Sequence, residues 1–153
     1  MPHIHEKIDF TVSVFIVQDH KVLFIFHRQL QRWLPIGGHI ELEENPEQAA
    51  LREAKEESGL EVELVGERSP LEAEPGLIPL LAPSYMDIHL INEPHWHIGL
   101  IYFARVKSGQ VTLNVEEHQD IQWLGEEDFE DARWELTKPL KFYAREALRR
   151  ILN

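Results

Sequence analysis

The stretch GGHIELEENPEQAALREAKEESGL, residues 37–60, decides the fold of this chain and holds most of its candidate chemistry. Asn45 and Pro46 are typical of a helix start, because an Asn side chain can accept from the free amides of the first turn and Pro fits the first helical position. Good helix formers follow as far as Ser58, and Gly59 suits the left-handed residue that often ends a helix. The pattern predicts a helix from Pro46 to Ser58.

Three glutamates of this predicted helix share one face. Glu53, Glu56 and Glu57 stand at positions i, i+3 and i+4, so their side chains project within an arc of roughly 100°. Carboxylates this close repel one another and destabilise the helix unless a cation lies among them. Mg²⁺ and Mn²⁺ prefer oxygen ligands, so the cluster predicts a site for one of these ions. Arg52 lies one turn before Glu56 and can orient it by a charge-assisted hydrogen bond.

The charged and glycine positions of this stretch resemble the Nudix box, the sequence signature of the Nudix hydrolases. The resemblance rests on Gly38, Glu44, Arg52-Glu53, Glu56-Glu57 and Gly59, which stand at the spacing of that signature. It implies an α/β fold, a Nudix-type α/β/α sandwich around a mixed β-sheet. One position departs from the family pattern. Ile36 directly precedes the glycine pair, where proline is usual, and this affects only the shape of the local loop.

The resemblance also implies a reaction. Nudix hydrolases cleave a nucleoside diphosphate linked to another moiety, with water attacking a phosphorus, and divalent ions neutralise the phosphates and polarise that phosphorus. The site residues implied by the family pattern are the metal or water ligands Glu53, Glu56 and Glu57, a carbonyl of Gly38 or Gly37, and the supporting residues Arg52 and Glu44. The predicted cofactor is Mg²⁺ or Mn²⁺.

In this family a carboxylate from outside the box often joins the metal site. Glu117, a few residues before Trp123, is the first candidate here, and Glu116 is the second. Only one of two adjacent side chains in an extended segment can face inward. A solvated loop carboxylate is the alternative interpretation of both residues.

Nine histidines are many for a chain of 153 residues. His95 and His97 would share one face of a strand, and His89 and His39 could converge with them. Three interpretations are open: ordinary sheet histidines, contacts to a substrate phosphate when protonated, or a site for a borderline metal such as Zn²⁺ when neutral. We predict substrate contacts from His39, His95 and His97, together with Arg28 at the end of an early strand.

Apolar alternation and apolar runs predict the remaining elements. Strands are expected at 10–17, 22–26, 61–67, 85–91 and 97–106, the last of them central, and a closing helix at 137–152. Residues 69–83 contain four prolines, which exclude a regular helix or central strand. This segment is expected to be a lid on the substrate side, a dimer contact, or a loop packed over its own domain.

Composition limits the function classes. The length suits a single Nudix hydrolase domain over residues 1–153, and a net charge of -12 argues against binding long nucleic acid. A small nucleotide or nucleotide-like diphosphate remains compatible, because bound cations set the local field. No apolar run approaches the length of a membrane span, and the absence of cysteine fits a cytoplasmic protein. A homodimer is left open, since dimers are frequent among relatives of this type.

Two other function classes use the same fold. An isopentenyl diphosphate isomerase has the same fold, but that family requires a catalytic cysteine and this chain has none. A catalytically silent Nudix-fold domain that binds nucleotides or regulates a partner is the second alternative. Such domains typically lose box carboxylates, and all of them are present here.

Overall fold

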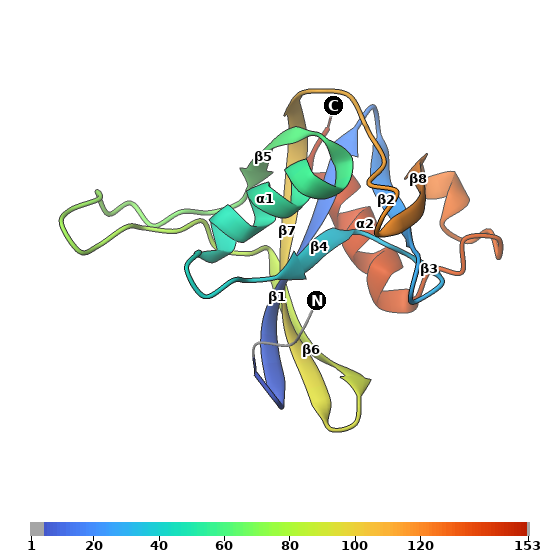
Figure 1. Cartoon of the computed structure of the whole chain (residues 1–153). Helices are drawn as coiled ribbons and strands as arrows, with labels where there is room; N and C mark the ends of the chain where they lie inside the picture. Colours follow the sequence, from blue (N-terminus) through green and yellow to red (C-terminus); the bar gives the residue numbers. More distant parts are fainter. Residues whose placement is uncertain (1–4, 153) are drawn as a thin grey trace.

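A mixed β-sheet forms the middle layer of the molecule, with helix α1 on one face and helix α2 on the other (Figure 1). The computed structural model describes residues 5–152. Its strands are β1 (Ile8–Gln18), β2 (Lys21–His27), β3 (Arg32–Leu34), β4 (Ile36–His39), β5 (Glu61–Val65), β6 (Tyr85–Asn92), β7 (His95–Ser108) and β8 (His118–Leu124). Its helices are α1 (Pro46–Ser58), the short 3-10 helix η1 (Glu126–Asp128) and α2 (Lys138–Arg150). The predicted α/β/α sandwich is confirmed.

Strand β7 is central, as its hydrophobic sequence predicts. It runs parallel to β1, from Ile8 opposite Trp96 to Val17 opposite Arg105. Along its other edge it pairs antiparallel with β6 and, further on, with β5. The far edge of β1 pairs with β4 near its start and with β2 at its end. The box therefore begins on a strand, β4, that is anchored to the middle of the sheet.

The two faces of β1 build two different cores, as side-chain alternation requires. The core under α1 contains Val12, Val14 and Ile16 of the strand with Ala49, Ala50 and Ala54 of the helix. The core under α2 contains Phe15 and Val17 of the strand with Ala144, Ala147 and Ile151 from the C-terminal end. Each of these side chains is at most 1% exposed. The small alanines let both helices approach the sheet closely, so α1 is held against β4.

Helix α1 begins and ends where its sequence predicts. The Asn45 side chain accepts from the Gln48 amide at 2.9 Å, and the Gln48 side chain accepts from the Asn45 amide at 2.9 Å. Gly59 adopts the left-handed conformation, with φ of 77°. The closing helix is shorter than predicted, since Ile151 is already extended. In residues 5–152 no helix has both the length and the apolar character needed to cross a membrane.

Residues 66–84 form an arm that projects away from the body of the molecule between β5 and β6 (Figure 1). Bridges between Arg68 and Leu81 and between Glu74 and Leu77 hold its two sides together. Its tip is apolar yet exposed, with Ile78 at 72%. The segment is thus ordered, as predicted, but its tip does not pack over its own domain.

Candidate active site

Two glycines of β4 allow close approaches, Gly38 to Glu53 of α1 and Gly37 to the backbone of β1. A Cβ atom at Gly38 would stand 2.2 Å from Oε1 of Glu53, and one at Gly37 would stand 2.3 Å from the carbonyl oxygen of Val12. Any other residue would collide at both positions. Gly38 leaves room for the Glu53 carboxylate, and the Gly37 amide donates to that of Glu57. Both side chains turn toward the sheet and are only 6% and 3% exposed.

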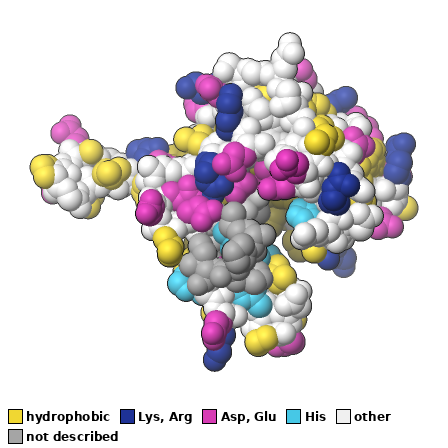
Figure 2. All heavy atoms as spheres, viewed as in Figure 1, with side chains coloured by type: hydrophobic (Ala, Val, Ile, Leu, Met, Phe, Trp, Pro, Cys, Tyr) yellow, Lys and Arg dark blue, Asp and Glu magenta, His cyan; other side chains and the backbone are white. Residues whose placement is uncertain are grey.

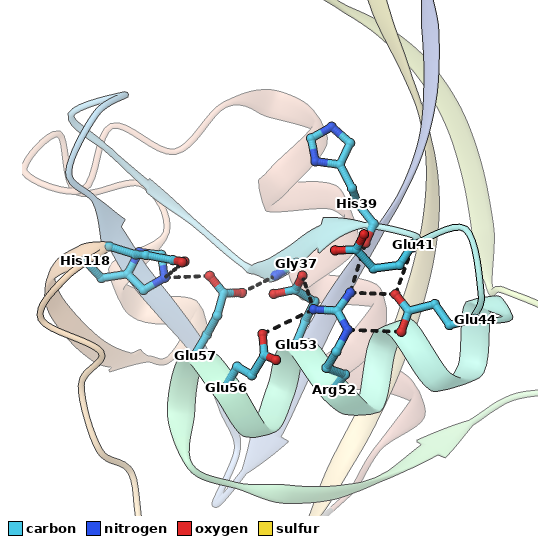
Figure 3. A network of polar contacts seen from close by, with 10 residues as sticks. Gly37, His39, Glu41, Glu44, Arg52, Glu53, Glu56, Glu57 and His118 are labelled. Carbon is cyan, nitrogen blue, oxygen red and sulfur yellow. Dashed lines mark hydrogen bonds and ion pairs between the residues drawn. The ribbon is translucent and has the colours of Figure 1, made fainter. Parts of the chain in front are cut away.

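Both oxygens of the Glu57 carboxylate are held by neighbouring groups (Figure 3). Its Oε1 accepts from the Gly37 amide at 2.8 Å, and its Oε2 lies 2.5 Å from Nε2 of His118. Oε2 of Glu117 is 3.8 Å from the same histidine nitrogen. One ligand atom from each of Glu57, Glu117 and His118 lies within 4.8 Å of the other two, so β8 and the loop before it complete the site.

His118 was not predicted, and its geometry assigns it a supporting role. The side chain is 1% exposed, and its Nδ1 has no hydrogen-bond partner among residues 5–152. A proton on Nδ1 would leave a buried N–H group without an acceptor, which is unfavourable. The proton is therefore assigned to Nε2, which donates it to Glu57. His118 then orients the Glu57 carboxylate and leaves the second carboxylate oxygen toward Gly37. The one sequence signal was its place directly after Glu117.

Arg52 ties the carboxylates of the box together (Figure 3). It donates to both oxygens of Glu44, at 2.6 and 3.0 Å, to Glu53 at 2.9 Å and to Glu56 at 3.2 Å. It also donates to the carbonyl of His39 at 3.1 Å. The contact with Glu56 agrees with the spacing argument. The Glu56 side chain is 58% exposed and lies at the rim, unlike its two neighbours.

Burial and mutual repulsion raise the proton affinity of the inner carboxylates. Burial, followed by the charge of Glu57, raises the pKa of Glu53 to about 8, although Arg52 opposes the shift. Burial also raises the pKa of Glu57, against the hydrogen bond from His118. The hydrogen bond from Arg52 lowers the pKa of Glu44. Two desolvated carboxylates on one helix face are the electrostatic setting that a bound cation would stabilise.

The donor set fits a hard divalent ion. Glu53, Glu57 and Glu117 offer carboxylate oxygens, and Glu56 offers another at the rim. Oxygen donors of this kind suit Mg²⁺ or Mn²⁺. Asp and Glu side chains gather on the surface over α1 (Figure 2). A separate surface hollow of about 530 Å³ is lined by residues of α2 and η1 and contains none of the four candidate metal ligands.

The loop before β8 brings Glu117, and not Glu116, beside Glu57. Arg28 fixes this loop. Its Nη2 donates to the carbonyl of Val115 at 2.7 Å, and its amide donates to the carbonyl of Glu117 at 3.2 Å. Arg28 therefore holds the loop that carries Glu117, whereas the metal role of Glu117 and the contact of Arg28 with substrate stay predictions.

His39, His95 and His97 come together, but on the opposite face of the sheet from the box carboxylates. Gly38 faces Glu53 of α1, so the adjacent His39 points to the other face. The ring of His97 lies 4.9 Å from that of His39 and 5.1 Å from that of His95. The convergence that the sequence left open is therefore observed for these three residues, and their contact with substrate stays a prediction.

The chain matches known proteins both in sequence and in fold. A family model described as the NUDIX domain matches residues 7–149. A NUDIX-family hydrolase from Clostridium perfringens is 35% identical with a TM-score of 0.79, and the match covers 92% of this chain and 96% of that one. A MutT NUDIX hydrolase from Burkholderia pseudomallei, 21% identical with a TM-score of 0.66 over 95% and 99% of the chains, shows the fold alone. No sequence among curated proteins matches the chain significantly.

Proposed function

We propose, from the premise that the chain belongs to the Nudix hydrolase family, that it is a divalent-metal-dependent pyrophosphohydrolase. Its substrate would be a nucleoside diphosphate linked to another moiety, cleaved by water at a phosphorus. One observation carries the proposal. Glu53 and Glu57 are buried side by side against the two glycines of β4, with burial raising the pKa of each. A silent domain would have no need to maintain this unfavourable charge.

We assign the metal to Glu53, Glu56, Glu57 and Glu117, with the carbonyl of Gly38 as a further ligand. A bound Mg²⁺ or Mn²⁺ would neutralise the substrate phosphates and polarise the phosphorus under attack. A carboxylate beside the ion accepts the proton of the attacking water, and Glu53 is our assignment for this step. Its hydrogen bond from Arg52 holds the carboxylate in one orientation.

The remaining polar residues position these carboxylates. Arg52 is held in turn by Glu44, which accepts two hydrogen bonds from it. His118 orients Glu57 from the other side. Residues of this kind affect metal affinity or activity by 10–100-fold in other sites, although they touch neither ion nor substrate.

The metal-free protein should lose stability as pH rises from about 5 to 8. Below its ordinary value of 4.5 the Glu53 carboxyl is protonated in both states, whereas between 4.5 and about 8 only the folded state keeps the proton. Linkage then lowers the free energy of unfolding across this window, on the order of 3 kcal/mol. Thermal unfolding in EDTA at pH 5, 6.5 and 8 measures the effect. Adding Mg²⁺ should raise the melting temperature most at pH 8, and an equal rise at pH 5 would contradict the assignment.

Glu117→Gln should reduce kcat by roughly tenfold to a thousandfold, because it removes a carboxylate from the reacting centre. Glu116→Gln is the matched control. Its side chain is exposed and lies outside the group formed by Glu57, Glu117 and His118, so its kcat should match the wild type. Steady-state turnover of both variants decides the matter. Equal rates for the two would remove Glu117 from the site.

The reaction itself is tested by a panel assay with Mg²⁺ or Mn²⁺. The panel covers normal and oxidised nucleoside triphosphates, ADP-ribose, dinucleoside polyphosphates and nucleotide sugars, with Glu56→Gln as a control for contaminating hydrolases. We expect metal-dependent cleavage of at least one compound, reduced by Glu56→Gln. Tight binding of a panel compound with no cleavage of any would favour the silent nucleotide-binding alternative.

A homodimer stays a prediction, and the structure offers a surface for it. Apolar side chains on the α1 side of β1, β6 and β7 are 37–59% exposed: Ile8, Phe10, Met86, Ile88, Leu90 and Trp96. Exposed apolar patches often mark interaction sites. Light scattering should show a dimer that Ile88→Asp converts to monomers, while a monomeric wild type would contradict it.

Three further expectations also stay predictions. They are a single domain over residues 1–153, a cytoplasmic location and the absence of long nucleic acid as a partner.

A further inference from the structure

We propose a second metal site, for a Zn²⁺-class ion, formed by Asp9, His95 and His97 with His39 beside them. One ligand atom of each of the first three lies within 4.8 Å of the other two. This histidine site, as we call the four residues, lies outside the box. It does not depend on the proposed hydrolase function, and the results expected for it are measured by metal binding and metal ligation.

Strand pairing places the four side chains on one face. Asp9 of β1 is the register partner of His97 of β7, and His95 lies two residues earlier on the same face. His39 of β4 pairs with Thr11, two residues after Asp9. Helix α2 covers this face further along, where Tyr143 donates to Asp87 at 2.7 Å. The histidine site therefore lies beyond the reach of α2, at the opposite side of the sheet from α1.

The distances in the histidine site are those of ligands around an ion. Oδ2 of Asp9 is 3.2 Å from Nε2 of His95 and 3.4 Å from Nε2 of His39. Charge-assisted hydrogen bonds are shorter, about 2.7–2.9 Å. Four ligands at roughly 2.0–2.1 Å from a tetrahedral Zn²⁺ are separated from one another by about 3.3 Å. The two separations from Asp9 each match the length of one edge of such a tetrahedron.

The orientation of His95 also suits a metal ligand. Its Nδ1 lies 2.9 Å from the carbonyl of Glu6, so the proton on this nitrogen is donated to the backbone. In the neutral ring, Nε2 then directs a lone pair toward the side on which Oδ2 of Asp9 lies. A cation bound between this nitrogen and Oδ2 of Asp9, which are 3.2 Å apart, would contact both atoms. Ligating histidines usually donate their other ring nitrogen to a carbonyl or carboxylate in this way.

Asp9 is fixed in a comparable manner. Its carboxylate is 1% exposed, and its Oδ1 accepts from the His5 amide at 2.7 Å, which turns Oδ2 toward the histidines. His95 is 4% exposed. Histidine nitrogens with one carboxylate form a donor set that favours Zn²⁺ over Mg²⁺. The two sites of the chain would thus select different ions.

The histidine site is joined to the box through β4. The carbonyl of His39 accepts from Arg52, while the side chain of His39 contributes to the histidine site on the other face. An ion in the histidine site would link β1, β4 and β7 at the part of the sheet that α2 does not cover. We infer a structural ion that stabilises the strand on which the box begins.

Untagged protein stripped with EDTA tests the proposal. The Glu57→Gln variant is titrated with Zn²⁺ by calorimetry in excess Mg²⁺, so that Zn²⁺ binding at the box is weakened. We expect one equivalent of Zn²⁺ to bind with a Kd of about 1 μM or tighter. His97→Ala and Asp9→Asn should each weaken this binding by more than roughly 100-fold. His20→Asn is the matched control. It removes one exposed imidazole in a turn where φ is 61°, a conformation that Asn tolerates, and should leave binding unchanged.

X-ray absorption at the zinc edge, on the Glu57→Gln protein, remains decisive if a variant fails to fold. We expect nitrogen and oxygen ligands at roughly 2.0–2.1 Å with the scattering pattern of at least two imidazoles. Absence of stoichiometric Zn²⁺, binding that survives both His97→Ala and Asp9→Asn, or a shell of oxygen alone would each overturn the proposal. So would a result in which Zn²⁺ fails to bind and His97→Ala raises KM, since the histidines would then contact substrate.

Discussion

Glu57→Gln should lower kcat by roughly three orders of magnitude while the protein stays folded. The substitution removes a negative charge from the centre of the site and replaces one oxygen by an amide. In the wild type, the Glu57 carboxylate accepts hydrogen bonds from both Gly37 and His118. Gln can accept from one of these donors and must turn its own N–H groups toward the other. The ion would lose a charged ligand whose orientation was fixed on both sides.

Stability should respond in the opposite direction to activity. Burial raises the pKa of Glu57, so the ionised side chain destabilises the metal-free fold, and Gln removes that cost. We expect the melting temperature in EDTA above pH 7 to be equal to or higher than that of the wild type. Kinetics over a Mg²⁺ titration and thermal unfolding measure the two effects. Glu63→Gln, an exposed glutamate on β5, is the control, and a kcat within threefold of the wild type in Glu57→Gln would contradict the role of Glu57.

Arg52→Met should produce the largest loss of stability among single changes in the box. The side chain makes hydrogen bonds to Glu44, Glu53 and Glu56 and to one backbone carbonyl. Its removal leaves the first two carboxylates, both largely buried, without their cation. Breaking such a pair costs about 3 kcal/mol, which corresponds to a drop of roughly 6–12 °C in melting temperature for a chain of this size.

Activity should fall as well, because Glu53 and Glu56 lose the group that orients them. Arg52→Lys should recover only part of the loss, since an ammonium cannot reproduce the two parallel bonds to Glu44. Arg133→Met offers a comparison, because its pair with Asp131 is exposed and should contribute less than about 1 kcal/mol. Equal melting temperatures for Arg52→Met and Arg133→Met would show that the network is not structural.

The helix and its carboxylates could be predicted from sequence because their determinants are local. The caps at Asn45 and Gly59 and the spacing of Glu53, Glu56 and Glu57 lie within one short segment. The resemblance to the family, confirmed by the match over residues 7–149, came from that same segment. His118 was missed because its contact with Glu57 spans 61 residues along the chain. The position of His118 directly after Glu117 was the one local signal, and it does not identify Glu57 as the contact.

The histidines illustrate a different limit. His39 follows Gly38 directly, and it was predicted to contact substrate together with His95 and His97. In a strand, however, adjacent side chains point to opposite faces, so the glycine faces Glu53 and the histidine faces Asp9. The extent of β4 was not predicted, and without it the alternation could not be applied. The convergence of His95 and His97 with Asp9 required the parallel register of β1 and β7, which is a tertiary property.

The bridge between Arg68 and Leu81 brings the two ends of the arm into contact, so the sheet and both cores are complete without the arm tip. Doubling the length of a flexible loop between fixed ends costs only about 0.6 kcal/mol of additional closure entropy. An exposed tip of this kind is where insertions and deletions are tolerated. Residues 70–79 can therefore lengthen, shorten or exchange sequence over evolutionary time at little expense to folding. The segment gives this scaffold a place to acquire new recognition while the chemistry under α1 stays constant.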